Sequence, residues 1–196
     1  MSKIYGTLAV AALALAATPA FAQIKIASVG PMTGQYAAFG EQLRRGAEMA
    51  VKDINAAGGV NGQQLVLQIG DDSCDPKQAT AVANKMASDK VVFVAGHYCS
   101  GSSIPASDIY KEAKILQITP ASTNIKLTDD AAAKGNTTVF RTCGRDDVQG
   151  ATVGAYIIKN NKTAKIAVLH DKSPYGKGVA DETVKALAKG GIKPAM

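Results

Sequence analysis

The chain has 196 residues, of which 46% are hydrophobic and 19% charged, a globular balance that excludes a disordered or collagen-like chain. The formal net charge is +6, but the longest basic run is Arg44-Arg45 and acidic residues are interspersed, so no nucleic-acid partner is expected. Trp is absent, aromatic residues make up 5%, and there are 19 glycines. A core of Ala, Val, Ile and Leu with close backbone packing suits a layered α/β fold.

Residues 1–22 have the organisation of a secretory signal peptide. An apolar Ala/Leu/Val stretch follows Lys3, and Ala20-Phe21-Ala22 provides a small-x-small cleavage site. The apolar stretch is about eleven residues long, shorter than the ~20 that a membrane span needs, so a transmembrane anchor is the weaker alternative. No Cys lies at the cleavage site, as a lipoprotein would require. We expect export to the periplasm, cleavage after Ala22 and a mature chain that begins at Gln23.

The three cysteines, Cys74, Cys99 and Cys143, allow three single pairings in an oxidising compartment. Placement favours Cys74–Cys99, because each residue follows a predicted strand and neighbouring parallel strands would bring their loops together. Cys143 would then be free. A metal site is not expected, since there is no Cys-x-x-Cys motif and His97 and His170 are far apart in the chain.

Strands and helices alternate through the first part of the mature chain. Strands are predicted at 24–29, 64–69, 91–95 and 115–118, and helices at 39–56, from 75 through 86, and at 103–113. The first helix has apolar residues at three-and-four spacing and ends at Gly58-Gly59, and the second opens with Asp75 as N-cap and Pro76 at N1. Short loops between such elements predict a doubly wound parallel sheet.

Periodicity disappears in a polar stretch between Thr119 and Thr138, and the pattern then starts again. Helices are predicted at 147–160 and 175–188, with strands at 165–169 and from Ile192 onward. A βαβ unit that starts afresh predicts a second lobe. We therefore expect lobe one at 23–140 and an incomplete second α/β lobe at 141–196.

Ligands of open parallel sheets bind at the carboxyl ends of the strands, so the loops there are the candidate sites. The loop at 96–103 is rich in glycine and hydroxyl groups and enters a helix, which suits a carboxylate. Other roles remain open for these residues. Ser100, Ser102 and Ser103 could be N-caps, Thr119, Thr123 and Asn124 could be loop formers, and Phe39 and Tyr175 could be ordinary packing residues.

Sequence motifs of common enzymes are missing: there is no Gly-x-Ser-x-Gly elbow, Walker loop or His-Glu-x-x-His. The pairs Asp71-Asp72, Asp129-Asp130 and Asp146-Asp147 are adjacent, so their side chains diverge, and solvated or capping roles are expected. His97 and His170 each end a predicted strand without an evident nucleophile, which favours hydrogen-bonded loop histidines. The chain is not expected to be an enzyme.

Four stretches carry a family resemblance, at residues 71–79, 96–100, 105–110 and 170–176. They resemble the branched-chain amino-acid binding proteins of ABC importers, in the type I periplasmic binding protein superfamily, and the similarity extends over residues 24–190. The resemblance implies two type I lobes, of which this chain holds the first and the start of the second.

The resemblance also assigns roles to single residues. Cys74 and Cys99 correspond to the lobe-one disulfide. Ser100 and Thr123 match hydroxyls that hold the ligand α-carboxylate, whereas the α-ammonium meets the Ala121 carbonyl and also the Thr123 hydroxyl. Phe39 matches an aromatic residue beside the ligand, and Tyr175 matches the aromatic residue presented by the second lobe. This chemistry is consistent, because a zwitterion needs donors and acceptors and an aliphatic tail needs an apolar wall.

The implied function is that of a periplasmic receptor, which captures a branched-chain amino acid between two lobes and delivers it to a membrane permease, its only link to the membrane. No cofactor is implied. The alternative is an exported hydrolase or amidase using Ser100 or His170, whereas a sugar-responsive repressor would need a helix-turn-helix where the signal peptide lies. Family members continue well beyond residue 196 and supply the acidic partner of the ammonium there. We therefore expect this chain alone to bind amino acids weakly or not at all.

Overall fold

The computed structural model describes residues 23–195, so the predicted signal peptide and its cleavage site lie outside the described residues. In chain order the elements are β1 (Ile24–Gly30), α1 (Ala37–Ala56), β2 (Leu65–Asp71), α2 (Pro76–Ser88), β3 (Phe93–Gly96), α3 (Ser100–Glu112), β4 (Leu116–Thr119), α4 (Lys126–Ala133), β5 (Val139–Arg141), α5 (Asp146–Asn160) and α6 (Pro174–Lys189). Each strand and helix predicted before residue 119 is present, with its ends shifted by a few residues. Within the described part of the chain, no helix has the length and apolarity that a membrane span needs.

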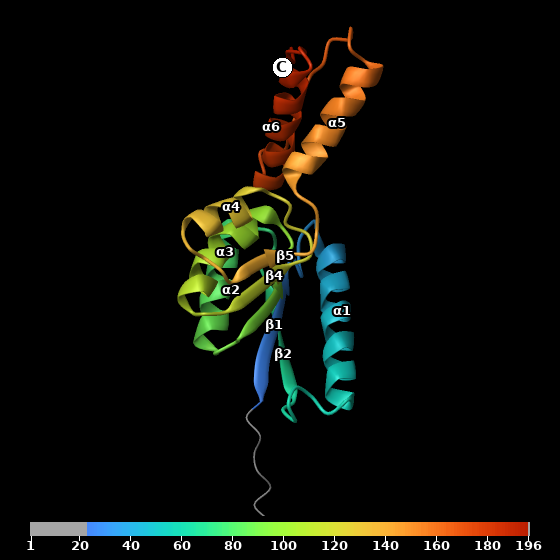
Figure 1. Ribbon diagram of the computed structural model, residues 1–196. Helices are drawn as coiled ribbons and strands as arrows, with labels where there is room; N and C mark the ends of the chain where they lie inside the picture. The colour runs from blue at the N-terminus through green and yellow to red at the C-terminus, as the bar shows by residue number, and fades with distance from the viewer. Residues whose placement is uncertain (1–22, 196) are drawn as a thin grey trace, which may run out of the picture.

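The strands form one parallel sheet in the order β2-β1-β3-β4-β5. The chain passes from β1 outward to β2, crosses back over β1 to β3, and then continues to β5. In Figure 1, α1 covers one face of this sheet while α2, α3 and α4 lie on the other. The predicted doubly wound parallel sheet is therefore confirmed. Its strand order reverses between β1 and β3, and ligands of such sheets bind at the carboxyl ends of the strands at that point.

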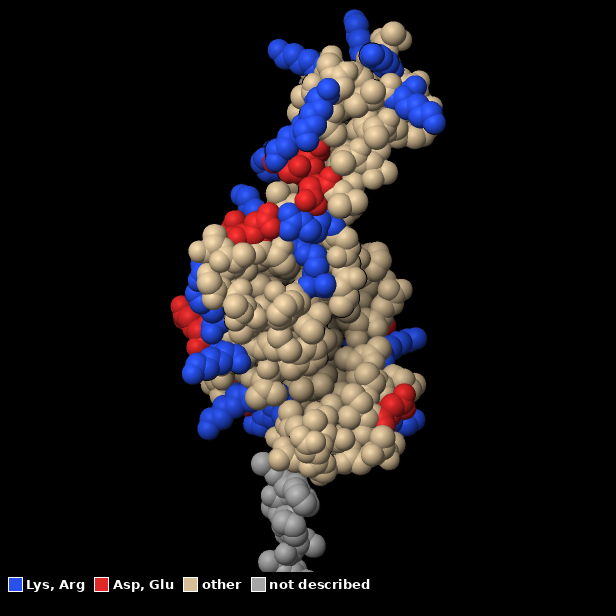
Figure 2. Space-filling view, in the orientation of Figure 1, with Lys and Arg blue, Asp and Glu red and all other residues tan. Residues whose placement is uncertain are grey.

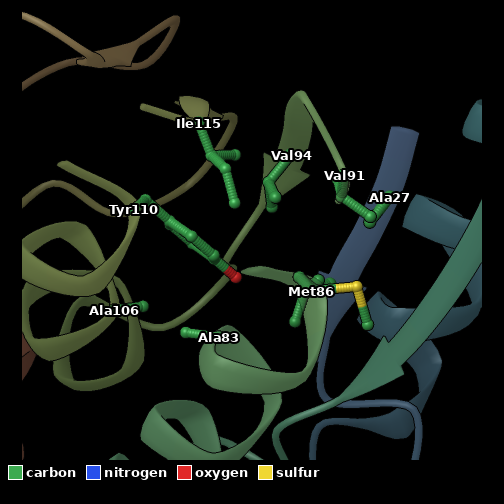
Figure 3. Packing of buried hydrophobic residues seen from close by; sticks show 9 residues of the cluster. Ala27, Ala83, Met86, Val91, Val94, Ala106, Tyr110 and Ile115 are labelled. Atoms are coloured by element: carbon green, nitrogen blue, oxygen red, sulfur yellow. The ribbon is translucent and has the colours of Figure 1, made fainter. Parts of the chain in front are cut away.

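The main core lies between the sheet and helices α2 and α3 (Figure 3). Its buried members are Ala27, Val29, Ala83, Met86, Val91, Val94, Ala106, Tyr110 and Ile115. Alanine side chains on β1, α2 and α3 leave room for the larger Met86 and Tyr110, both of which are buried. This packing of small and medium side chains is what the composition predicted, and it holds α2 and α3 against the sheet.

Local signals explain where several helices begin. Asp75 accepts a hydrogen bond from the Gln78 backbone N–H at 2.8 Å, and Pro76 occupies the first turn of α2, as predicted. Ser173 caps α6 in the same way, accepting from the Gly176 N–H at 3.0 Å. The start of α3 differs from the prediction, since the helix begins at Ser100 instead of Ser103.

The stretch from Thr119 to Thr138 was predicted to lack regular structure, and this prediction is wrong. The stretch contains α4 and is followed directly by the short strand β5. Only Leu127 and Ala131 of α4 are buried, a single pair at helical spacing. The pattern is too short to be distinguished from a polar loop. A three-residue strand such as β5 gives even less periodicity.

The strand predicted at 165–169 is not present, and no strand begins at Ile192. Residues 165–169 have no neighbouring strand among the described residues, and the Ala195 backbone N–H donates to the Ile166 carbonyl at 2.7 Å. A strand requires a partner for its backbone groups, which periodicity alone does not provide.

Helices α5 and α6 run side by side in the same direction and project beyond the sheet (Figure 1). Their close approach depends on glycine, because a Cβ atom at Gly150 would lie 2.5 Å from the Glu182 Cβ. On the face shown in Figure 2, basic side chains are scattered over the body and others surround the outer end of these helices.

Candidate functional site

Several loops meet at the carboxyl ends of the strands. The Asp72 backbone N–H donates to the Gly30 carbonyl at 3.0 Å, which joins the loop after β2 to the last residue of β1. Cys74 and Cys99 form a disulfide with their Cα atoms 5.5 Å apart, and Cys143 is free. The pairing is as predicted. The prediction assumed, however, that the two cysteines follow neighbouring strands, and β1 lies between β2 and β3. The two cysteine loops meet across the end of β1.

Ser100 is the first residue of α3 and is 2% exposed. Its hydroxyl accepts a hydrogen bond from the Asn124 backbone N–H at 3.2 Å, and Cys99 occupies the N-cap position. Ser100 is therefore not a cap. Since a hydroxyl group also carries one donor, the Ser100 proton remains available for an acceptor such as a carboxylate.

The segment 119–124 presents the other two predicted polar contacts. The Thr123 Oγ1 atom is buried and makes no hydrogen bond of good geometry among residues 23–195, although the side chain lies near the Asp146 carboxylate, whose pKa it lowers; the Thr123 carbonyl accepts from the Asp146 N–H at 2.9 Å. Ala121 donates its N–H to Thr119 Oγ1 at 3.3 Å. A buried hydroxyl without a well-formed hydrogen bond costs free energy, so Thr123 keeps hydrogen-bonding capacity for a better-placed partner.

An apolar hollow of about 510 Å³ lies beside this segment, between α1 and the sheet. Phe39 and Ala121 both line it, together with Tyr98, whose ring stacks on Phe39 with centroids 5.0 Å apart. Ser100, Thr123 and Tyr175 do not line this hollow. The structure thus places Phe39 and Ala121 on one surface and joins Ser100 to the same loop through Asn124.

Tyr175 lies at the start of α6 and is 47% exposed. Burial raises the pKa of Tyr98, and the phenols of Tyr175 and Tyr36 raise it further, which indicates that Tyr175 faces the same edge of the sheet. Asn124 links the two parts of the chain, because its Nδ2 donates to the Pro174 carbonyl at 2.6 Å.

Arg141 is a residue of this region that the sequence reasoning missed. Its Nη1 donates to the Ser122 carbonyl at 2.6 Å and its Nη2 to the Asn124 carbonyl at 2.9 Å. The guanidinium therefore holds the residues on both sides of Thr123. Arg141 belongs to β5. In the sequence, the only sign of its role was that a basic residue follows the apolar pair Val139-Phe140.

The adjacent carboxylates diverge as predicted, but two of them are not solvated. Asp72 is buried and contacts His97, with Nδ1 and Oδ2 2.5 Å apart, and Asp71 instead accepts from the Met32 N–H at 2.9 Å. Asp146 is also fully buried, and its carboxylate makes no hydrogen bond of good geometry among the described residues; burial raises its pKa, although the nearby Thr123 side chain lowers it. Their burial results from long-range packing.

Neither histidine is arranged as a general base. The ring of His97 is buried between Asp72 and Tyr110, and the ring of His170 accepts the Lys172 backbone N–H at 3.0 Å. Both are hydrogen-bonded loop histidines, as predicted. General-base catalysis would require one of these rings to face a nucleophile.

Comparison with known proteins identifies the family. Residues 23–195 match the profile of the family described as periplasmic binding protein. The chain belongs to this family. It is 50% identical over 190 residues to an amino acid binding protein of Pseudomonas aeruginosa, covering 96% of this chain and 50% of the relative. It is 52% identical over 176 residues to Leu/Ile/Val-binding protein homolog 2 of Brucella abortus, covering 90% of this chain and 46% of that relative.

The fold of this family member is also found in solved structures. The branched-chain amino acid transporter substrate binding protein LivJ of Streptococcus pneumoniae, in complex with isoleucine, has a TM-score of 0.72 and 30% identity, covering 84% of this chain and 47% of that chain. The chain spans about half the length of the curated relatives it matches, at 50% and 46%. These relatives do not support the alternative of an exported hydrolase.

Proposed function

We propose that this chain provides the lobe-one half of a ligand site in a periplasmic substrate-binding protein of an ABC importer, and that the ligand is a branched-chain amino acid. Residues 23–140 would form lobe one and residues 141–196 part of the second lobe. The names of the relatives support this ligand class, since they include Leu/Ile/Val-binding and amino acid binding proteins.

The observation that carries the proposal is a pair of hydroxyl groups with unused hydrogen-bonding capacity. The Ser100 hydroxyl accepts one hydrogen bond and has an unused donor, and Thr123 Oγ1 is buried without a well-formed hydrogen bond in the described part of the chain. Ser100 would donate to the ligand carboxylate, Thr123 would contact both carboxylate and ammonium, and the Ala121 carbonyl would accept from the ammonium. The apolar hollow lined by Phe39 and Tyr98 lies beside Ala121 and suits an aliphatic side chain.

Tyr175 would act from the opposite side. It lies on α6, next to Pro174, whose carbonyl is bound by Asn124 of the proposed half-site. Closure of the second lobe would bring this phenol over the ligand, so Tyr175 would affect mainly the dissociation rate. No covalent step and no cofactor are required.

Export and delivery complete the proposal. The signal peptide would direct the protein to the periplasm, where the closed, loaded form would dock on the permease subunits of the importer. Contact with the membrane would then occur only through the permease.

Calorimetric titration of the whole gene product with leucine, valine, glutamate and leucinamide tests the proposal. We expect saturable binding of the aliphatic amino acids, and Ser100→Ala and Thr123→Ala should each weaken it by about 1–3 kcal/mol, because part of a charged ligand group loses its partner. Ser107→Ala is the matched control on α3, since the Ser107 hydroxyl donates to the Ile104 carbonyl of its own helix, at 2.8 Å, and not to the proposed half-site.

Mass spectrometry of the titrated samples separates a receptor from a hydrolase. Unchanged ligands are expected in every case. Conversion of leucinamide to leucine, or wild-type affinity in both hydroxyl variants, would contradict the proposal.

A further inference from the structure

The ring of His97 is completely buried and contacts two polar side chains from different elements. Its Nδ1 lies 2.5 Å from Oδ2 of Asp72, which follows β2, and its Nε2 lies 3.0 Å from the hydroxyl of Tyr110 on α3. All three residues are 0% exposed. The proposed function assigns no role to this network.

The direction of these hydrogen bonds follows from the burial of Tyr110. Burial raises the pKa of the Tyr110 phenol, and the Asp72 charge raises it further, so the phenol keeps its proton. The hydroxyl then donates to Nε2, and Nδ1–H donates to the Asp72 carboxylate. Asp72 Oδ1 also accepts the Cys74 N–H at 2.8 Å, which ties the network to the disulfide loop. Each polar group in this network therefore has a partner.

The backbone of His97 extends the network to the loop after β4. Its carbonyl accepts from Thr119 Oγ1 at 2.6 Å and from Ser103 Oγ at 3.2 Å. Ser122 Oγ bonds the next carbonyl, that of Tyr98, at 3.0 Å. The position of the His97 peptide therefore determines where residues 119–122 lie.

The same two loops carry the proposed ligand contacts. Ser100 lies three residues after His97 and accepts the Asn124 N–H at 3.2 Å, while Thr123 lies between Ser122 and Asn124. A shift of the His97 backbone, which the ring contacts with Asp72 and Tyr110 oppose, would move the loop segments that carry both hydroxyls. We propose that His97, held by Asp72 and Tyr110, is a positioning residue that fixes the Ser100 and Thr123 hydroxyls in register with each other.

This inference rests on the proposed function, because it concerns the same half-site. A buried histidine could also serve stability alone, and the two roles have different consequences. A residue that only stabilises the core changes the unfolding midpoint and leaves affinity unchanged in the folded protein. A positioning residue changes affinity through the placement of Ser100 and Thr123 relative to each other, so its effect disappears once one of these two hydroxyls has been removed.

Tyr110→Phe carries the test, since it removes one hydroxyl and keeps the ring that packs in the core (Figure 3). His97→Ala would leave the Asp72 carboxylate unpaired in the interior and is expected to unfold the protein. The whole gene product is titrated with leucine as wild type, Tyr110→Phe, Ser100→Ala and the double variant. Ile115→Val is the control, because it removes one methylene group from the same cluster without touching His97.

We expect Tyr110→Phe to raise the leucine Kd about fivefold, the effect of one hydrogen bond. The double variant should bind no more weakly than Ser100→Ala, and Ile115→Val should keep the wild-type Kd. Amide hydrogen exchange at Ser122 and Asn124 should increase in Tyr110→Phe and remain unchanged in Ile115→Val.

Two outcomes would overturn the inference in distinguishable ways. If wild type binds leucine and folded Tyr110→Phe keeps its Kd and exchange rates, the network is only structural and the proposed function stands. If wild type binds no leucine, the proposed function fails and the positioning role fails with it.

Discussion

Removal of the Cys74–Cys99 disulfide should destabilise the protein by an amount set mainly by the loop that it closes. The two residues are separated by 25 positions. In the chain-entropy description, a cross-link of this span lowers the entropy of the unfolded chain enough to stabilise the fold by about 3–4 kcal/mol at 25 °C. For a domain of this size, that corresponds to a decrease in Tm of roughly 10 °C.

The perturbation is the double variant Cys74→Ala with Cys99→Ala, compared with wild type in urea denaturation followed by circular dichroism. Cys143→Ala is the matched control, since this thiol is free and donates a weak hydrogen bond to the Ser122 carbonyl, with Sγ 3.6 Å from the oxygen. The control should lose about 1 kcal/mol or less. Reduction of wild type with dithiothreitol should shift its midpoint to that of the double variant.

The reasoning would be refuted if the double variant and wild type unfolded at the same urea concentration. It would also be refuted if peptide mapping joined Cys143 to either of the other cysteines. A loss far above 4 kcal/mol would show that the bridge also stabilises the folded loops directly, beyond its effect on the unfolded chain.

Four further predictions concern other parts of the chain. Burial raises the pKa of Asp146, so the folded state binds a proton at this carboxylate more tightly than the unfolded state does. Wild type should therefore gain stability relative to Asp146→Asn as the pH falls from 7 toward 4. Parallel pH profiles of the two proteins in urea denaturation would contradict this. Gly46→Ala should stabilise α1 by about 1 kcal/mol because a Cβ there meets nothing within 4 Å. Gly150→Ala should instead destabilise the α5–α6 contact by about 1–3 kcal/mol, and equal unfolding midpoints for the two variants would contradict at least one of these two expectations. Intact-mass analysis of exported protein should show a chain beginning at Gln23, and retention of residues 1–22 would exclude cleavage after Ala22.

The sequence by itself determined the layered fold and most element positions. Alternating apolar strands and amphipathic helices with short loops permit few arrangements other than a parallel sheet with right-handed crossovers. Local chemistry was equally informative, since Asp75 and Pro76 mark the start of α2 through contacts within one turn. Elements with a single buried pair or a few residues, such as α4 and β5, carry too little periodicity to be found in this way.

Tertiary structure decided every feature that depends on distant residues. The segment 165–169 has the pattern of a strand, yet it has no neighbouring strand in the described chain, because pairing depends on a second segment as well as on the first. Asp72, His97 and Tyr110 come from three elements and meet only after the sheet has formed. Arg141 likewise reaches the carbonyls beside Thr123 only because β5 pairs with β4. Sequence patterns identify the loops at the carboxyl ends of the strands, whereas the hydrogen bonds that hold those loops in place arise from packing.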